Sequence, residues 1–214
     1  LPLKYLGIPL DEKRLKNSDW DPSVVKMENR MGCSLGTLLN IVGHSTLANS
    51  SLSSLPLYMM SFYGLPKGVK KKYDRPRSRF LWSGEKQKRK YHLVAWPYFC
   101  LHKDLRGPGV LDLEIMNIAL LAKWFWKMET EEGMWQDIIT RKYGGEGCLS
   151  MATKKCRDSN FWSSLMKIKE IFYGFVKKKL GDGQNTRFWE DIWVNTKSRK
   201  EAYLRLYDLC FDYN

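Results

Sequence analysis

The chain has 214 residues, of which 43% are hydrophobic and 14% aromatic, including nine tryptophans. This composition excludes disorder along the whole length, because disordered chains are poor in aromatic residues. Lys and Arg number 36 against 23 Asp and Glu, giving a formal net charge of +13. We therefore expect attraction to polyanions, with nucleic acid first and an anionic membrane surface second.

The cysteines and the N-terminus indicate a reducing compartment. The five cysteines are odd in number, irregularly spaced and without a CxxC pair, which argues against a disulfide framework. The first residues lack a basic leader followed by a long apolar run, and no stretch reaches about 18 uninterrupted apolar residues. We expect a nuclear or cytoplasmic protein that is not secreted and has no membrane partner. Because Leu1 already lies inside a motif, we interpret the chain as a fragment.

The first third of the chain predicts a short strand followed by helices. Residues 3–10 read as a strand entering a turn. Asp21 suits a helix cap and Pro22 the first helical position, and the following apolar face is loose: Val24, Val25, Met27, Met31 and Leu35. Helix is also expected over 38–55 and 57–62. Pro76 is expected to break or begin a helix.

The remainder predicts a loop, three helices and a hairpin. Residues 83–110 are rich in Gly, Pro and charge, and we expect one strand at 92–96. Asp112 should cap a helix that ends at Gly133, with a buried face spaced by three and four residues: Leu113, Met116, Leu120, Trp124 and Met128. Short helices are expected over 135–143 and from Asn160. Residues 175–180 and 185–189 should pair as a hairpin across a glycine-containing turn.

Six short motifs occur in order along most of the chain: KYLGIPL (4–10), LSSLPLYMMSF (52–62), FLWSG (80–84), HLVAW (92–96), NIALLAKWFW (117–126) and GDGQNTRFWEDIW (181–193). Together they resemble the region after the polymerase active site in the reverse transcriptases of plant LINE-type (non-LTR) retrotransposons. The resemblance covers residues 1–193. It departs from the family at MGCSLGTLL (31–39), which lacks the family's Trp and Arg.

The resemblance implies a mainly α fold, with a thumb-like helical region, a helical connector and a small β-hairpin. The implied divisions are 1–82 (end of the palm and thumb), 83–150 (basic loop and connector) and 151–214 (helix and hairpin before a missing zinc-binding module). The KYLGIPL segment would lie near the family's primer grip, which raises Lys4, Tyr5 and Gly7 as nucleic-acid contacts. The partners implied are template and primer, as RNA and DNA, and an upstream fingers-palm domain of the same polyprotein.

No catalytic residues, metal site or cofactor are expected in the chain itself. Polymerases hold two metal ions with paired aspartates, and the sequence has no adjacent Asp-Asp pair; Mg²⁺ is expected only for the full polymerase. It also lacks a P-loop, a GxSxG elbow and an HExxH helix. Cys100 and His102 are close, but zinc needs three or four ligands, so we favour a loop histidine and a half-buried cysteine.

A basic run at 67–90 is the main candidate for nucleic-acid binding, since cations neutralise phosphates and release counterions. Aromatic residues are interleaved with it; we expect Phe80 and Trp82 to be core anchors, and the tryptophans at 124, 126, 135, 162, 189 and 193 to be core as well. The alternative for the cations is a solvated face. The candidate residues are Lys67, Lys70, Lys71, Lys72, Arg75, Arg77, Arg79, Lys86, Lys88, Arg89 and Lys90.

The function predicted is therefore a fragment of an RNA-directed DNA polymerase that binds template and primer non-specifically and is inactive alone. Two alternatives stay open: a decayed retrotransposon remnant, and a basic interaction domain with no enzymatic role. A basic helix on a membrane surface is disfavoured, because the charge lies in Pro- and Gly-containing sequence.

Overall fold

The computed structural model describes residues 3–5, 8–10, 15–32, 40–82, 94–144, 152–153, 155, 158–177, 181–183, 187–189, 191, 193 and 197–211. The chain divides into two compact units, Leu1–Lys169 and Glu170–Asn214, with the boundary inside one helix. This division does not test the three functional regions expected from the sequence, which stay a prediction.

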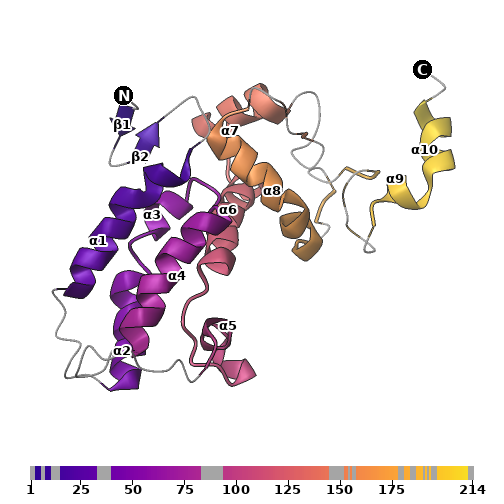
Figure 1. Cartoon of the computed structure of the whole chain (residues 1–214). Coiled ribbons are helices and arrows are strands. Elements are labelled where there is room, and N and C mark those ends of the chain that lie inside the picture. Colours follow the sequence, from indigo (N-terminus) through magenta and orange to yellow (C-terminus); the bar gives the residue numbers. More distant parts are fainter. Residues whose placement is uncertain are drawn as a thin grey trace. The chain divides into compact units, whose positions relative to one another are not determined.

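The described residues are mainly helical, as expected (Figure 1). After two short strands and a 3₁₀ turn at Asn17–Trp20, the first unit contains α1 (Asp21–Gly32), α2 (Ile41–Leu47), α3 (Leu57–Met60), α4 (Lys67–Trp82), α5 (Trp96–Phe99), α6 (Leu113–Thr130), α7 (Met134–Ile139) and the start of α8 (Asn160–Phe175). Single π-helical turns extend α2 through Ala48–Leu52 and α7 through Thr140–Gly144.

The strand expected at 3–10 is two strands. β1 (Leu3–Tyr5) pairs antiparallel with β2 (Ile8–Leu10), and Lys4 lies opposite Pro9. Proline has no N–H to donate to a ladder and is found at strand edges. The pair is short, and in the described residues its sheet has these two strands alone.

The predicted helix at Asp21 is confirmed, and its inner face builds the main core. Trp20 and Met27 are fully buried, and Trp20 meets Tyr73 of α4 edge to face with ring centroids 6.5 Å apart. Edge-to-face aromatic pairs add roughly 0.5–1.5 kcal/mol beyond the apolar area they bury. α1 and α4 are thus packed directly against each other.

Asn117 of α6 fixes the turn that follows α3. Its side-chain amide donates to the carbonyl oxygens of Met60 (2.7 Å) and Tyr63 (2.9 Å), and its oxygen accepts from the N–H of Leu65 (2.8 Å). The residue is buried, so these bonds offset the cost of removing an amide from water. Asn117 therefore ties α6 to the segment that leads into α4.

Asn49 makes a similar connection to the segment before α6. Its side chain donates to the carbonyl of Gly109 (3.0 Å) and accepts from the N–H of Leu111 (2.9 Å). One amide thus satisfies two backbone groups of a segment that has no helical or strand hydrogen bonds of its own. The Asn49 side chain supplies the hydrogen bonds that a neighbouring strand would supply in a sheet.

Pro76 does not break the helix, contrary to the expectation from the sequence. α4 runs without interruption from Lys67 to Trp82 with Pro76 inside it. Pro76 itself is buried, and the residues one turn before and after it, Tyr73 and Phe80, are buried too. Burial on both sides outweighs the hydrogen bond that proline removes, a cost of about 3 kcal/mol in an exposed helix.

Two further expectations need correction in the described residues. Of the strand expected at 92–96, residues 92–93 lie outside the described residues, residues 94–95 are irregular and Trp96 begins α5. The hairpin expected at 175–189 is not seen either, because α8 continues to Phe175 and residues 181–183 and 187–189 form bends and turns. Buried apolar residues recur at helical spacing along α8 as far as Phe172, and this pattern favours a helix over a strand here.

The second unit ends in two helices that were not expected from the sequence, α9 (Arg199–Ala202) and α10 (Leu204–Phe211). Ser198 caps α9 by accepting from the N–H of Glu201 (3.2 Å). Cation–π contacts join the unit: the Arg199 guanidinium lies 5.2 Å from the Trp193 ring centre, and the Lys200 ammonium lies 4.1 Å from that of Tyr207. These contacts make the aromatic residues part of the local packing.

The tryptophans expected in the core divide into two kinds. Trp162 is fully buried, and Trp124 is half-buried, donating from Nε1 to the carbonyl of Ser61 (2.7 Å). Trp126 is 56% exposed, so its assignment to the core is wrong. It lies only two residues from Trp124, which places the two indoles on different faces of α6.

Candidate nucleic-acid interface

The first part of the basic run, 67–82, is α4, and helical geometry sorts its side chains into a buried face and an exposed face. Val69 and Tyr73 are fully buried and Phe80 is 6% exposed, which confirms Phe80 as a core anchor. The exposed face carries five of the predicted cations, Lys67, Lys71, Lys72, Arg75 and Arg79. The helix thus presents most of its charge on one side.

Arg77 is the exception, because its side chain is 0% exposed. Its guanidinium donates to the Asp74 carboxylate (3.0 Å), the Ser53 hydroxyl (2.9 Å) and the carbonyl of Leu111 (2.6 Å), and it lies 5.3 Å from the centre of the Trp96 ring. Burial lowers the pKa of Arg77, and the Asp74 charge opposes this effect. Arg77 therefore forms a buried ion pair with Asp74 that serves the fold, and its prediction as a phosphate contact is wrong.

Two other predicted cations are engaged in ion pairs at the surface. Lys70 lies 3.1 Å from Asp112 and 2.8 Å from Glu114, and Lys72 pairs with Asp21 of α1. Partial burial lowers the pKa of Lys70, but its hydrogen bonds to Glu114 and Asp112 outweigh this, and the pKa is raised. Both lysines are therefore less available to a phosphate than their position in the sequence suggests.

Four of the cations predicted in the basic run have no counter-ion among the described residues: Lys67, Lys71, Arg75 and Arg79. Three of them, Lys71, Arg75 and Arg79, are spaced by four residues. A rise of 1.5 Å per residue sets successive members about 6 Å apart along the helix axis. They form a row, which we call the α4 cation row.

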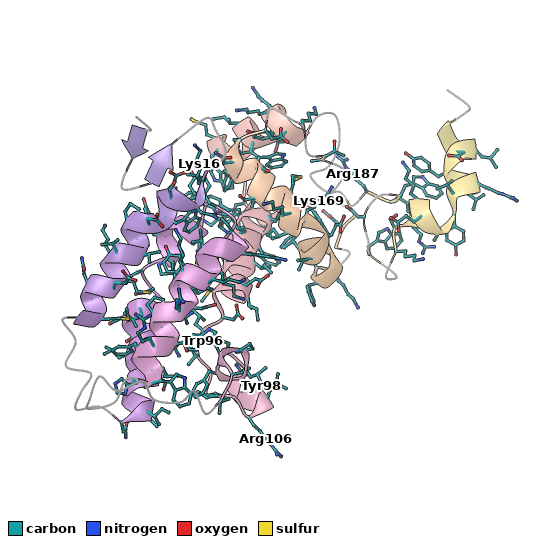
Figure 2. All side chains as sticks on the ribbon, viewed as in Figure 1. Lys16, Trp96, Tyr98, Arg106, Lys169 and Arg187 are labelled. Atoms are coloured by element: carbon teal, nitrogen blue, oxygen red, sulfur yellow. The ribbon has the colours of Figure 1, made fainter. Side chains whose placement is uncertain are left out.

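The α4 cation row lines one wall of a cleft between α1 and α4. The cleft encloses about 840 Å³, and α1 supplies its other wall. Its lining residues are Asp21, Val24, Val25, Glu28, Lys71, Lys72, Asp74, Arg75, Pro76, Arg79 and Trp96. In Figure 2 the labelled Trp96 lies beside the lower part of α4.

The charges of the cleft favour an anion. Asp21 is already paired with Lys72, and Asp74 with Arg77. Burial raises the pKa of Asp74, with the charge of Arg77 opposing the shift. Among the described lining residues this leaves the α4 cation row facing Glu28, so the cleft carries a net positive charge.

The sequence analysis predicted only the lysines and arginines of the cleft as site residues, and among those it missed are Val25, Glu28 and Trp96. Val25 was expected in the apolar helix face, yet it is 51% exposed. Trp96 was assigned to a strand. The only local signal was the placement of Val25 and Glu28 three positions apart, on one helix face with Asp21; their position opposite α4 depends on tertiary packing.

The other predicted contacts cannot be placed in the site. Lys4 and Tyr5 belong to β1, of which only the backbone is described. Gly7 lies outside the described residues, as do Lys86, Lys88, Arg89 and Lys90. They stay predictions.

Cys100 and His102 have structural surroundings. His102 is exposed and its Nδ1 lies 2.9 Å from the Asp104 carboxylate, in the turn before α6. Burial raises the pKa of the Cys100 thiol to about 11. No cluster of three or more His, Cys, Asp and Glu side chains suited to a metal ion occurs among the described residues.

Within the described part of the chain, every helix is too short or too polar to span a bilayer. α6 has 18 residues, about the length of a span, but four of them are charged: Glu114, Lys123, Lys127 and Glu129.

Comparison with known proteins gives two relatives, both from Arabidopsis thaliana. The uncharacterized mitochondrial protein AtMg00310 is 31% identical over 143 residues, which cover 66% of this chain and 93% of that protein. The chain belongs to the AtMg00310 family. A second relative, named "Putative ribonuclease H protein At1g65750", is 30% identical over 202 residues, or 89% of this chain.

The chain spans 31% of the length of At1g65750 but nearly all of AtMg00310. No family model matches it, and no solved structure does. Both relatives are plant proteins, which is consistent with a plant retrotransposon origin for this family.

Proposed function

We propose that the chain is the part of a plant LINE-type reverse transcriptase that follows the catalytic palm. It binds template and primer, RNA and DNA, through their phosphates and without sequence preference. The observation that carries the proposal is the α4 cation row, Lys71, Arg75 and Arg79, exposed at one-turn intervals beside a positively charged cleft.

The chemistry of the row suits a polymerase accessory region. Contacts to phosphates position a nucleic acid but carry no sequence information, and an enzyme that copies any template needs this kind of grip. Arg75 and Arg79 can each hold a phosphate through two parallel N–H donors, whereas Lys71 acts as a point charge.

The relatives support a retroelement origin at a coarser level. One of them is named a putative ribonuclease H protein, and ribonuclease H is an enzyme that acts on nucleic acid; the chain corresponds to about a third of its length. In our proposal the remaining polymerase parts, including the fingers and palm and their Mg²⁺ ions, belong to an upstream segment of the same polyprotein. Nuclear or cytoplasmic localisation is likewise part of the proposal.

A salt-dependent binding measurement tests the proposal. The ligand is a fluorescently labelled RNA template with an annealed DNA primer and a single-stranded overhang, used in two unrelated sequences. Fluorescence anisotropy should give equal affinities for both sequences. The triple variant Lys71→Ala/Arg75→Ala/Arg79→Ala should weaken binding to both and flatten the slope of log K against log salt by about 2–3, since each contact contributes about 0.7–0.9.

A matched control removes three exposed charges that lie outside the cleft, Lys26, Lys103 and Lys123. This control should bind like the parent protein. If both triple variants lose the same affinity, the effect comes from net charge and not from the α4 cation row. If the parent protein does not bind even at low salt, a decayed remnant or a basic interaction domain is favoured. Primer extension by the purified chain should stay at background.

A further inference from the structure

The two walls of the α1–α4 cleft differ in chemistry. The α4 wall carries the cation row, whereas the α1 wall presents Val24 and Val25 between Asp21 and Glu28. Val25 is 51% exposed toward solvent and lies outside the buried face of α1 that includes Val24 and Met27. The cleft therefore offers cations on one side and, on the other, apolar surface flanked by two carboxylates.

The two helices that line the cleft are in direct contact below it. Trp20, immediately before α1, packs on Tyr73 of α4, and both side chains are fully buried. The bases of a double helix are paired and stacked inside it, so a duplex would present mainly its phosphates to the cleft, whereas a single strand can present phosphates and bases together.

A single strand also matches the two walls. Its phosphates can follow the α4 cation row, with steps of about 6 Å between cations. Its bases are unpaired and have free π-faces, which need an apolar or aromatic surface. Val25 of α1 and Trp96 of α5, which also lines the cleft, supply that surface, and the Trp96 indole already carries a cation–π contact from Arg77, at 5.3 Å, that holds it in place.

The acidic residues of the cleft do not oppose this arrangement. Asp21 and Asp74 are paired with Lys72 and Arg77, so they do not compete for the row. Glu28 stands on the apolar wall with Val25, one helical turn away. A carboxylate there can accept hydrogen bonds from base amino groups, while it would repel a phosphate placed on the α1 side.

We infer that the α1–α4 cleft binds a single strand of nucleic acid, with phosphates along Lys71, Arg75 and Arg79 and bases against Val25 and Trp96. This inference rests on the proposed function and specifies its ligand: within a primed template, the cleft holds the unpaired template and not the hybrid duplex. The cleft would therefore hold the template strand before it pairs with the growing DNA strand.

The test compares three labelled ligands of equal length: a single-stranded RNA, the blunt RNA–DNA hybrid of that RNA, and a single strand with abasic sites. The single-stranded RNA should bind at least about tenfold more tightly than the blunt hybrid at the same salt concentration, and the abasic strand should lose most of that advantage.

A neutral substitution separates base contacts from charge. Val25→Asn removes the apolar contact without adding charge and should weaken single-stranded RNA binding by about three- to tenfold, with little effect on the abasic strand. The matched control is Val42→Asn on α2, which is 65% exposed and outside the cleft, and it should bind like the parent protein.

The outcomes distinguish this inference from the proposed function. If the blunt hybrid binds as tightly as the single strand, or if Val25→Asn equals Val42→Asn, the cleft assignment is overturned while phosphate binding by the row stands. If none of the ligands binds even at low salt, both fail. Preference for the single strand that is lost in Val25→Asn supports the inference.

Discussion

The guanidinium of Arg77 and the carboxylate of Asp74 form an ion pair of 3.0 Å within a single helix, one turn apart, with the arginine completely buried. The same guanidinium also donates to Ser53 and to the carbonyl of Leu111. A buried cation of this kind is strongly destabilising when it loses its partners, although the intact pair contributes little on its own. Arg77 therefore links α4 to two other segments.

Replacing Arg77 with Ala should reduce the free energy of unfolding by about 3–5 kcal/mol, because Asp74 and two other acceptors would be left unpaired in the core. Urea unfolding followed by circular dichroism measures the change. Arg75→Ala, two residues away and exposed, should change stability by less than about 0.5 kcal/mol. The double variant Arg77→Met/Asp74→Asn should recover part of the loss; equal stability of the two single variants would contradict the structure.

Trp124 and Trp126 provide a second matched pair. Trp124→Ala should destabilise by about 3–5 kcal/mol, since its ring contacts Phe62, Trp135 and Phe161 at 5.4–5.6 Å and its indole N–H donates to Ser61. Trp126→Ala should cost less than about 1 kcal/mol, because that side chain is mostly exposed. Thermal unfolding of the two variants checks the order, and a larger loss for Trp126→Ala would be inconsistent with this packing.

The thiols of Cys100 and Cys210 should differ in reactivity. With a pKa of about 11, Cys100 is about one part in a thousand thiolate at pH 8, and only the thiolate reacts. Cys210 is exposed. Iodoacetamide labelling at pH 8, followed by peptide mass spectrometry, should modify Cys210 well before Cys100 in the native protein and both equally in urea. Equal native rates would show that Cys100 is not in this environment.

Stability should depend on pH through Asp112. Burial raises the pKa of Asp112, but hydrogen bonds from the backbone of Glu114 and from Lys70 outweigh this, so its pKa lies below the usual 3.8. A lowered carboxylate pKa adds stability above the usual value, and that stability is lost as the pH falls through the folded-state value. Asp112→Asn should therefore be less stable than the parent at pH 7, and the difference should shrink below about pH 3.8.

Lys70 affects the dependence of stability on pH at the alkaline end. Its raised pKa adds stability below the usual 10.5, which is lost as the pH rises through the folded-state value. Asp74, whose pKa is raised by burial, acts against Asp112 in acid because its protonated form is favoured in the fold. Urea titrations of the parent and Asp112→Asn across pH 2.5–7 isolate Asp112 by difference. A constant difference over that range would rule out this linkage.

The helices were largely predictable because their caps and apolar spacing lie in the local sequence. Asp112 caps α6 as expected, accepting from the N–H of Glu114 at 2.7 Å. The candidate site was less predictable for a specific reason: a break at Pro76 removes the helical phase that places Arg77 with Tyr73 on the buried face. Because the helix continues through Pro76, positions 69, 73, 77 and 80 lie on its buried face. Arg77 therefore lies on a different face from Arg75 and Arg79.

The remainder of the site depends on contacts distant in sequence. Lys70 finds Asp112 and Glu114 more than forty positions away, and Lys72 finds Asp21 about fifty positions away. No spacing rule within the basic run could separate these paired lysines from Lys71. For the same reason the sequence alone does not predict the cleft with Val25 and Trp96, because the cleft exists only where α1 and α4 pack together.

The double contact of Asn49 with Gly109 and Leu111 also makes the protein sensitive to chemical ageing. Spontaneous hydrolysis of the Asn49 amide would replace its N–H donor with a second carboxylate oxygen. That oxygen would face the carbonyl of Gly109, two acceptors at 3.0 Å with no proton between them. The segment before α6 would lose an attachment while a new negative charge entered a half-buried position, so hydrolysis of this one side chain would loosen this part of the fold.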